Sequence, residues 1–245
     1  MIDQDSYAEV ARVAIDRVLI EEREAVAEAG EVVFGALRAG GVLQAFGTGH
    51  SRSVALELVG RAGGLVPANQ LGIRDLVYYG DAAPSEILDP KVEREPGLAG
   101  RIWELADIHP EDAFVIISNS GGNAAIVEMA RLAVDHGHPV IAITSRAHTA
   151  RVSGVRLADL ATVVIDNGAP YGDAAVKPPG QAAICPVSNL TGTLIAQLLV
   201  AEVTGRFLAI GERPPVFVSA NTPGGDAHND LLLAPYGGRV RLGDA

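Results

Sequence analysis

The stretch Ala113-Phe114-Val115-Ile116-Ile117-Ser118-Asn119-Ser120-Gly121-Gly122-Asn123 decides the fold, because an apolar run passes directly into a loop of hydroxyls, amides and glycines. Five consecutive apolar residues are typical of a parallel strand covered on both faces. Residues 124–134 are mostly good helix formers, so a helix is predicted to begin at the loop. Its free N–H groups and positive dipole end would face an anion outside the strand's carboxyl end. An ordinary turn with a good N-cap is the alternative interpretation.

A second loop of the same kind follows another apolar run. Gly47-Thr48-Gly49-His50-Ser51 comes after a predicted strand, 42–46, and precedes a predicted helix, 52–61. The loop opens like a dinucleotide fingerprint, but Arg52 occupies the third glycine position. The chain also contains no Gly-Lys-Ser/Thr triplet, which excludes a P-loop. Two donor-rich turns without a nucleotide motif predict a site for a small phosphorylated metabolite, and we expect no cofactor.

The composition limits the class of protein. The chain has 245 residues, 48% of them hydrophobic, which is ample for a substantial core. Its 19 basic and 30 acidic residues give a net charge of −11, which argues against nucleic acid or an anionic membrane as a partner. Residues 1–9 show no export signal and no window reaches the roughly 20 apolar residues of a membrane span, so we expect a cytoplasmic protein. Cys185 is the only cysteine, which excludes a zinc site built on thiolates, and we expect no metal.

Helix and strand patterns alternate along the chain. A capping box at Ser6–Glu9 begins a long N-terminal helical region, 1–40, that ends at Gly40-Gly41. Residues 65–67 are a weak candidate for an edge strand, and residues 69–101 are irregular, with a charged cluster at 91–95 interpreted as a solvated helix face. The later predicted elements are strand 113–117, helix 124–136, strand 139–143, helix 149–157, strand 162–165, an apolar helix at 187–208 and an irregular tail, 211–245. This alternation predicts an α/β protein with helices on both faces of a parallel sheet and no internal domain boundary.

The two loops, together with Thr144-Ser145 after a third strand, resemble the sugar isomerase (SIS) phosphosugar-binding family over nearly the whole chain. Ala62-Gly63-Gly64-Leu65-Val66-Pro67 and the tail segment Gly224-Gly225-Asp226-Ala227-His228-Asn229 look like an uncharacterised branch often labelled as phosphoheptose isomerases. The resemblance implies one domain, 1–245, with a three-layer αβα sandwich and a five-stranded parallel sheet. It also implies a homodimer or homotetramer with shared active sites. The reaction is not specified, because the family includes isomerases, an etherase and regulators.

The resemblance implies roles for the loop residues. Ser118 and Ser120 match the serines that hold the phosphate, and Ser51 matches the serine of the first loop. Asn123 stands where the family commonly has serine or threonine, and Thr144 matches the threonine after the next strand, although a plain strand-end hydroxyl is an alternative. The complete predicted phosphate-binding set is Thr48, Gly49, His50, Ser51, Ser118, Asn119, Ser120, Gly121, Gly122, Asn123 and Thr144.

Aldose–ketose isomerisation needs a base beside the carbonyl and a donor to the adjacent oxygen. Glu57 lies six residues beyond Ser51 on the predicted helix, a rise of about 9 Å. Its Glu-Leu-x-Gly-Arg context resembles that of the catalytic glutamate of phosphoheptose isomerases, although it lies closer to the glycine loop here. We predict Glu57 as the base and His228 as the acid, in its own site or in that of another subunit. The alternatives are a solvated or salt-bridged glutamate, an exposed tail histidine and, for His50, a structural role.

The leading functional prediction is therefore a phosphosugar-binding protein that isomerises a sugar phosphate. One alternative is an etherase or lyase acting on a phosphorylated amino sugar, which would reuse the same proton abstraction. A phosphosugar sensor without turnover is the other alternative. Regulators of this family usually carry a separate DNA-binding domain, whereas the residues before the first predicted strand are acidic and contain no basic recognition helix. The apolar helix 187–208 contains no histidine, which weakens a specific heptose assignment.

Overall fold

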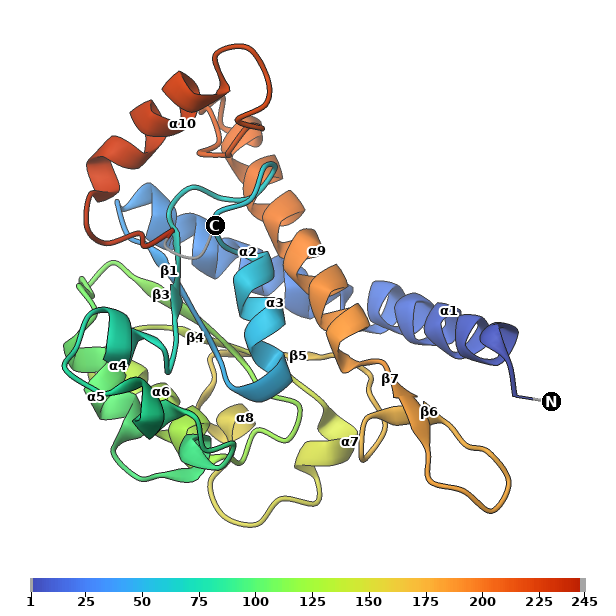
Figure 1. The fold of residues 1–245 in the computed structure, drawn as a ribbon. Coiled ribbons are helices and arrows are strands. Elements are labelled where there is room, and N and C mark those ends of the chain that lie inside the picture. The colour runs from blue at the N-terminus through green and yellow to red at the C-terminus, as the bar shows by residue number, and fades with distance from the viewer. Residues whose placement is uncertain (1, 243–245) are drawn as a thin grey trace.

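A five-stranded parallel sheet lies at the centre of the computed structural model, which describes residues 2–242 (Figure 1). The strands are β1 (Leu43–Gly47), β2 (Ala68–Leu71), β3 (Ala113–Ile117), β4 (Val140–Thr144) and β5 (Val163–Asp166). Their order in the sheet is β2-β1-β3-β4-β5, and every neighbouring pair is parallel. Both the sheet and its parallel pairing confirm the prediction.

Two separate hydrophobic layers cover the two faces of the sheet, because successive side chains of a strand point to opposite faces. Val115 and Ile117 of β3 pack in one layer, whereas Phe114 and Ile116 pack in the other. The first layer is formed by α1 (Gln4–Glu21), α2 (Arg23–Arg38), α3 (Arg52–Glu57) and α9 (Ser188–Ala209). The second is formed mainly by α4 (Asp75–Tyr78), α5 (Leu98–Glu104), α6 (Ala124–Asp135) and α8 (Leu157–Leu160). The three-layer αβα sandwich is therefore confirmed.

Several predicted boundaries are wrong for identifiable reasons. The N-cap of α1 is Asp3, with Ser6 completing the capping box from the third helical position, so the predicted box at Ser6–Glu9 lies one turn too late. The edge strand is β2 and not residues 65–67, because Leu65 bridges Val216 instead. The predicted helix 149–157 is replaced by α7 (Arg146–Thr149) and α8, separated at Gly154 with its φ of +82°.

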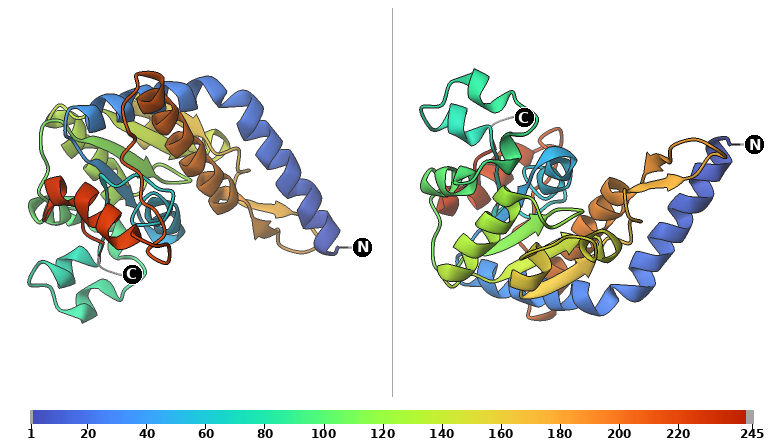
Figure 2. Two further views of the ribbon diagram at one scale, coloured as in Figure 1. Left: turned by 90° about the horizontal axis from the view of Figure 1, so that it is seen from above. Right: turned by 90° about the horizontal axis from the view of Figure 1, so that it is seen from below.

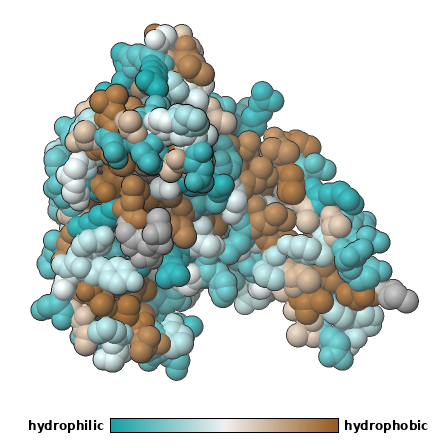
Figure 3. Space-filling model, turned by 45° about the horizontal axis from the view of Figure 1, so that its top comes forward, coloured by the Kyte–Doolittle hydropathy of each residue, from teal (hydrophilic) through white to brown (hydrophobic). Residues whose placement is uncertain are grey.

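An antiparallel hairpin, β6 (Ala174–Val176) and β7 (Ile184–Pro186), lies between β5 and α9, where the sequence predicts no element. It lies beside α1, where the hydroxyl of Tyr7 donates to the carbonyl of Pro186 over 3.2 Å. Together α1 and the hairpin form an arm that projects from the body (Figures 1 and 2). Hydrophobic side chains are exposed on both body and arm (Figure 3), and on α1 they include Val13 and Ile20, which are 64% and 76% exposed.

Helix α9 crosses the first layer as the apolar helix that the sequence predicted. It packs against α2 and α3, and Gly192 leaves room for Val54, which a Cβ at that position would approach to 2.9 Å. By length and composition α9 is the one helix in the described part of the chain that could cross a bilayer, a test that core helices also pass. The short 3-10 helices are η1 (Gly49–Ser51), η2 (Pro84–Ile87), η3 (Val92–Arg94) and η4 (Ala234–Tyr236).

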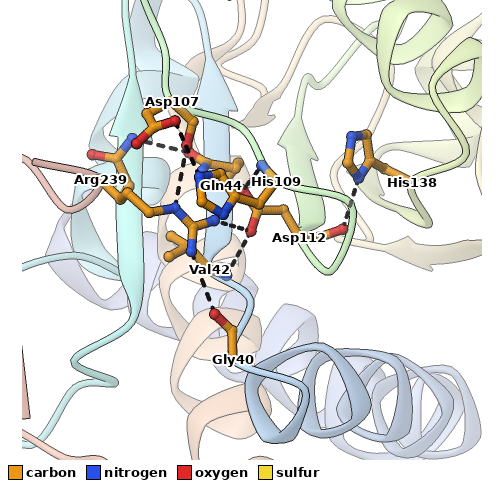
Figure 4. Close-up of polar contacts among 9 residues, drawn as sticks. Gly40, Val42, Gln44, Asp107, His109, Asp112, His138 and Arg239 are labelled. Carbon is orange, nitrogen blue, oxygen red and sulfur yellow. Dashed lines mark hydrogen bonds and ion pairs between the residues drawn. The ribbon is translucent and has the colours of Figure 1, made fainter. Parts of the chain in front are cut away.

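The tail is not irregular throughout, because it contains α10 (Gly225–Leu233), and its Arg239 belongs to a buried polar network (Figure 4). Asp112, which is fully buried, accepts hydrogen bonds from the N–H groups of Val42 and His109 and from the amide of Gln44, and it also pairs with the guanidinium of Arg239. Because these groups lie just before β1 and β3 or within β1, Arg239 is held at the amino-terminal edge of the sheet. We expect this network to hold residues 239–241 in place.

Candidate functional site

The two donor-rich loops lie side by side at the carboxyl edge of the sheet. Their strands β1 and β3 are neighbours, and Gly47 pairs with Ile117 at the point where both strands end. A Cβ on Gly47 would lie only 2.8 Å from the carbonyl oxygen of Ser51 and 3.2 Å from that of Ile117. The backbone at Ser51 and Ile117 therefore leaves no room for a side chain at position 47, which explains the glycine. The close approach of Gly47 and Ile117 also places the two loops next to each other.

The second loop folds around its own hydroxyls. The hydroxyl of Ser118 accepts from the N–H of Gly121 at 3.1 Å, and Gly121 adopts a φ of +67° that favours glycine. Asn123 then caps α6 with extended backbone. The N–H groups of Asn123 and Ala124 donate to no described residue, as expected for the first turn of a helix. These N–H groups and the dipole of a twelve-residue helix are available to an anion.

The end of β4 and the helix that follows it, α7, support the second loop from behind. The hydroxyl of Thr144 donates to the carbonyl of Asn119 at 3.4 Å and lies 3.1 Å from the hydroxyl of Thr149, which donates to the carbonyl of Ser120 at 3.2 Å. Thr144 is fully buried. Its hydroxyl is therefore placed to hold the loop in shape, in agreement with the strand-end alternative that the sequence left open.

Asn119 joins the loop to residues that the sequence analysis did not select. Its side-chain amide lies 3.4 Å from Nδ1 of His148 on α7 and accepts at Oδ1 from the amide of Asn167 at 3.1 Å. The ring of His148 meets that of Tyr171 edge-on, with the centroids 5.0 Å apart, and the guanidinium of Arg151 lies 4.2 Å from the same Tyr171 ring. The only local signal was the hydroxyl pair Thr144-Ser145, of which Ser145 caps α7.

The first loop borders a cavity of about 350 Å³ between the body and the hairpin. Gly49 takes a φ of +53°, and His50 lines the cavity together with Ser188 and Asn189 from the start of α9. The amide of Asn189 donates to the carbonyl of His50 at 3.3 Å, which fixes the loop against α9. The cavity is large enough for the body of a sugar beside the first loop.

Glu93 of η3 reaches both loops, although its charged cluster was interpreted as a solvated helix face. Its Oε1 accepts from the side-chain amide of Asn123 at 2.9 Å, and its Oε2 lies 3.5 Å from the position that a Cβ on Gly49 would occupy. The interpretation of the cluster is therefore wrong for Glu93. The sequence contains no signal for this contact, because η3 lies far from both loops along the chain, with α3, β2 and α4 between it and the first loop and α5 and β3 between it and the second.

The two predicted catalytic residues lie away from the loops within the chain. Glu57 ends α3, whereas the first loop precedes that helix, and its carboxylate pairs with Arg61 and accepts from the amide of Gln197 at 2.7 Å. His228 lies on α10 near the amino-terminal edge of the sheet, where its Nδ1 accepts from Arg213 at 2.9 Å and its Nε2 lies 3.0 Å from the carbonyl of Val216. Both side chains already have protein partners, so any catalytic role remains a prediction.

Comparison with known proteins identifies the family. The SIS domain family profile matches residues 6–145, which include both loops. The chain belongs to the SIS domain family. This SIS protein is also 34% identical over 244 residues to a UPF0309 protein of Listeria monocytogenes serotype 4b, an alignment that covers 97% of each chain. A UPF0309 protein of Streptomyces avermitilis is 35% identical over 242 residues, covering 96% of each chain.

Solved structures share the SIS fold at low sequence identity. A phosphoheptose isomerase from Francisella tularensis superimposes with a TM-score of 0.57 and 19% identity, covering 81% of this chain and 95% of that one. The phosphoheptose isomerase GmhA from Neisseria gonorrhoeae gives 0.54 and 17%, covering 82% and 96%. These likenesses establish the fold of the SIS protein and leave its reaction open. Within residues 2–242 no group of three or more His, Cys, Asp or Glu side chains could hold a metal ion.

Proposed function

We propose that this SIS protein binds a sugar phosphate at the carboxyl edge of its sheet and isomerises it between aldose and ketose forms. The phosphoryl group lies on the second loop and the amino-terminal end of α6, and the sugar extends past the first loop towards the 350 Å³ cavity. The observation that carries the proposal is the meeting of the two loops at Gly47 and Ile117. With a net charge of −11, the chain needs such local donors to capture an anion.

Binding is tested first by calorimetry with a panel of sugar phosphates and with inorganic phosphate. Ser118→Ala and Ser120→Ala each remove a hydroxyl from the second loop, and a hydrogen bond to a charged group is worth about 1.5–3 kcal/mol. We therefore expect affinity to fall roughly 10- to 100-fold for each variant. Ser219→Ala in the exposed tail is the matched control and should bind normally. Unchanged affinity in both loop variants would refute the proposed site.

Turnover is tested by NMR of the sugar phosphates that bind. Two carboxylates compete for the role of base, and the contacts of Glu93 with both loops favour it over Glu57, which is paired with Arg61. We expect Glu93→Gln to abolish conversion while affinity changes little, because glutamine keeps the shape but cannot accept the proton. Loss of conversion in Glu57→Gln alone would instead assign the base to Glu57. Unchanged conversion in both variants would exclude each of them as the base.

The same NMR experiment separates the alternatives to isomerisation. Release of an acid side group from a phosphorylated amino sugar would indicate an etherase or lyase. Tight binding without conversion of any sugar phosphate would indicate a sensor. We retain both alternatives because the fold alone does not determine the chemistry.

We further propose that the SIS protein works as a homodimer or homotetramer. Val18, Leu19, Val26 and Leu198 line a cavity of about 330 Å³ between α1, α2 and α9, together with Arg23 and Glu202, and Ile20 of α1 is 76% exposed. Exposed apolar side chains beside such a cavity suit a second copy of the chain. Light scattering should give the mass of an oligomer, and Ile20→Glu should reduce it. A monomer at micromolar concentration would contradict the proposal.

A further inference from the structure

A chain of side-chain amides starts at a backbone N–H and ends on the ring of His148. The N–H of Ala169 donates to Oδ1 of Asn167 at 3.0 Å, and the Nδ2 of Asn167 donates to Oδ1 of Asn119 at 3.1 Å. The Nδ2 of Asn119 then faces Nδ1 of His148 at 3.4 Å. A backbone N–H can only donate, so each amide in turn has one possible orientation.

This chain of amides from Ala169 through Asn167 and Asn119, here called the relay, determines which ring nitrogen of His148 carries the proton. Because Nδ2 of Asn119 is a donor, Nδ1 of His148 must accept, and the neutral ring therefore carries its hydrogen on Nε2. Ser145 fixes the two ends of the relay together, since its hydroxyl accepts from the N–H of His148 at 3.1 Å and donates to the carbonyl of Ala169 at 2.6 Å. Asn167 is 2% exposed, so solvent does not compete for the hydrogen bond between its Oδ1 and the N–H of Ala169.

The Nε2 atom of His148 is open to solvent beside the second loop. It makes no hydrogen bond to any described residue. The only buried side-chain nitrogen or oxygen atoms without a partner in residues 2–242 are those of Arg206 and Arg241, so Nε2 reaches solvent. The edge of the Tyr171 ring, 5.0 Å away between centroids, limits the rotation of the imidazole. The result is an oriented donor next to a loop that offers donors of its own.

We propose that His148 is a substrate-binding residue whose Nε2–H donates to an oxygen of the sugar, a hydroxyl or the carbonyl, while the second loop holds the phosphoryl group. This assignment rests on the proposed function and adds a recognition element to the same site. Asn119 links the two tasks, because its backbone belongs to the phosphate loop and its side chain sets the tautomer of His148. Inorganic phosphate has no sugar oxygens, so it does not engage His148.

The tautomer is measured directly by two-bond proton–nitrogen NMR of the histidine rings in the wild type. The spectra are recorded at about pH 8, and the signals absent from His148→Gln identify residue 148. We expect protonated Nε2 and unprotonated Nδ1, and Asn167→Ala should add the other tautomer. A wild-type ring protonated on Nδ1 would overturn the inference.

Binding is measured by calorimetry with two probes, inorganic phosphate and the sugar phosphate with the highest affinity. We expect His148→Phe to keep the affinity for inorganic phosphate and to lose about 3- to 10-fold for the sugar phosphate, the effect of one net hydrogen bond. His148→Gln supplies an amide donor and should recover part of that loss. Unchanged sugar-phosphate affinity in His148→Phe would refute only the role of His148. A wild type that binds neither probe would refute the proposed function as well.

Discussion

Replacing Arg239 by methionine should be among the most damaging single changes at the end of the tail. Arg239 is 8% exposed and is the cationic partner of Asp112, which is fully buried. Methionine fills much of the same space but leaves the carboxylate with three neutral donors, namely the N–H groups of Val42 and His109 and the amide of Gln44. Removing one partner of a buried ion pair costs about 3–5 kcal/mol. Because three donors remain, we expect a loss near the lower figure, about 3 kcal/mol.

Urea unfolding followed by circular dichroism at pH 7 measures this loss. The matched control is Arg38→Met, because Arg38 pairs with Glu212 at 3.1 Å while the two side chains are 56% and 42% exposed. An exposed pair contributes about 0–1 kcal/mol, so the control should change the free energy of unfolding by no more than that. A loss in Arg239→Met as small as in the control would refute the argument.

Two further predictions concern single positions. Gly121→Ala should destabilise the protein by about 1–2 kcal/mol, as should the control Gly137→Ala at a φ of +84°. Only Gly121→Ala should also weaken phosphate binding, because Gly121 lies within the second loop and its φ of +67° strains any other residue there, and equal calorimetric affinities of the two variants would contradict this. Burial raises the pKa of the Asp75 carboxyl above its ordinary value of 3.8. The folded state therefore favours the protonated carboxyl, and the stability that this group contributes is fully present below pH 3.8 and is lost as the pH rises through the raised pKa. In thermal melts, the melting temperature of Asp75→Asn should therefore rise relative to that of the wild type between about pH 4 and pH 7. A difference in melting temperature that does not change with pH would contradict this reasoning.

The central strands and long helices could be predicted because their signals are local. β3 has the predicted bounds, 113–117, and α9 differs from its prediction by one residue at each end. Such runs are apolar because both faces of the sheet are covered, which the sequence records directly. The short elements failed where tertiary contacts decide. β6 and β7 pair only with each other, and α10 follows a glycine, Gly224, in the left-handed region.

The candidate site divides in the same way. The loops could be predicted because glycines and hydroxyls directly follow two strands, and the parallel sheet brings those strands together. Glu93 and His148 could not, because neither belongs to a motif and each reaches its loop through a side-chain contact between segments about 30 residues apart in sequence. The residues around a phosphate-binding loop are therefore harder to infer from sequence than the loop itself.

This difference has a physical cause that bears on function. A phosphate-binding site is built largely from backbone N–H groups, whose positions follow from glycine geometry and from the start of a helix. Recognition of a particular sugar requires side chains with a fixed donor or acceptor at each point, and a histidine provides this only when its tautomer is set. In this SIS protein the tautomer of His148 is set by the N–H of Ala169, 21 residues further along the chain, which acts through the side chains of Asn167 and Asn119. Substitutions at Asn167 would therefore alter sugar selectivity without touching the sugar, whereas substitutions in the loop would alter affinity for every phosphate ester alike.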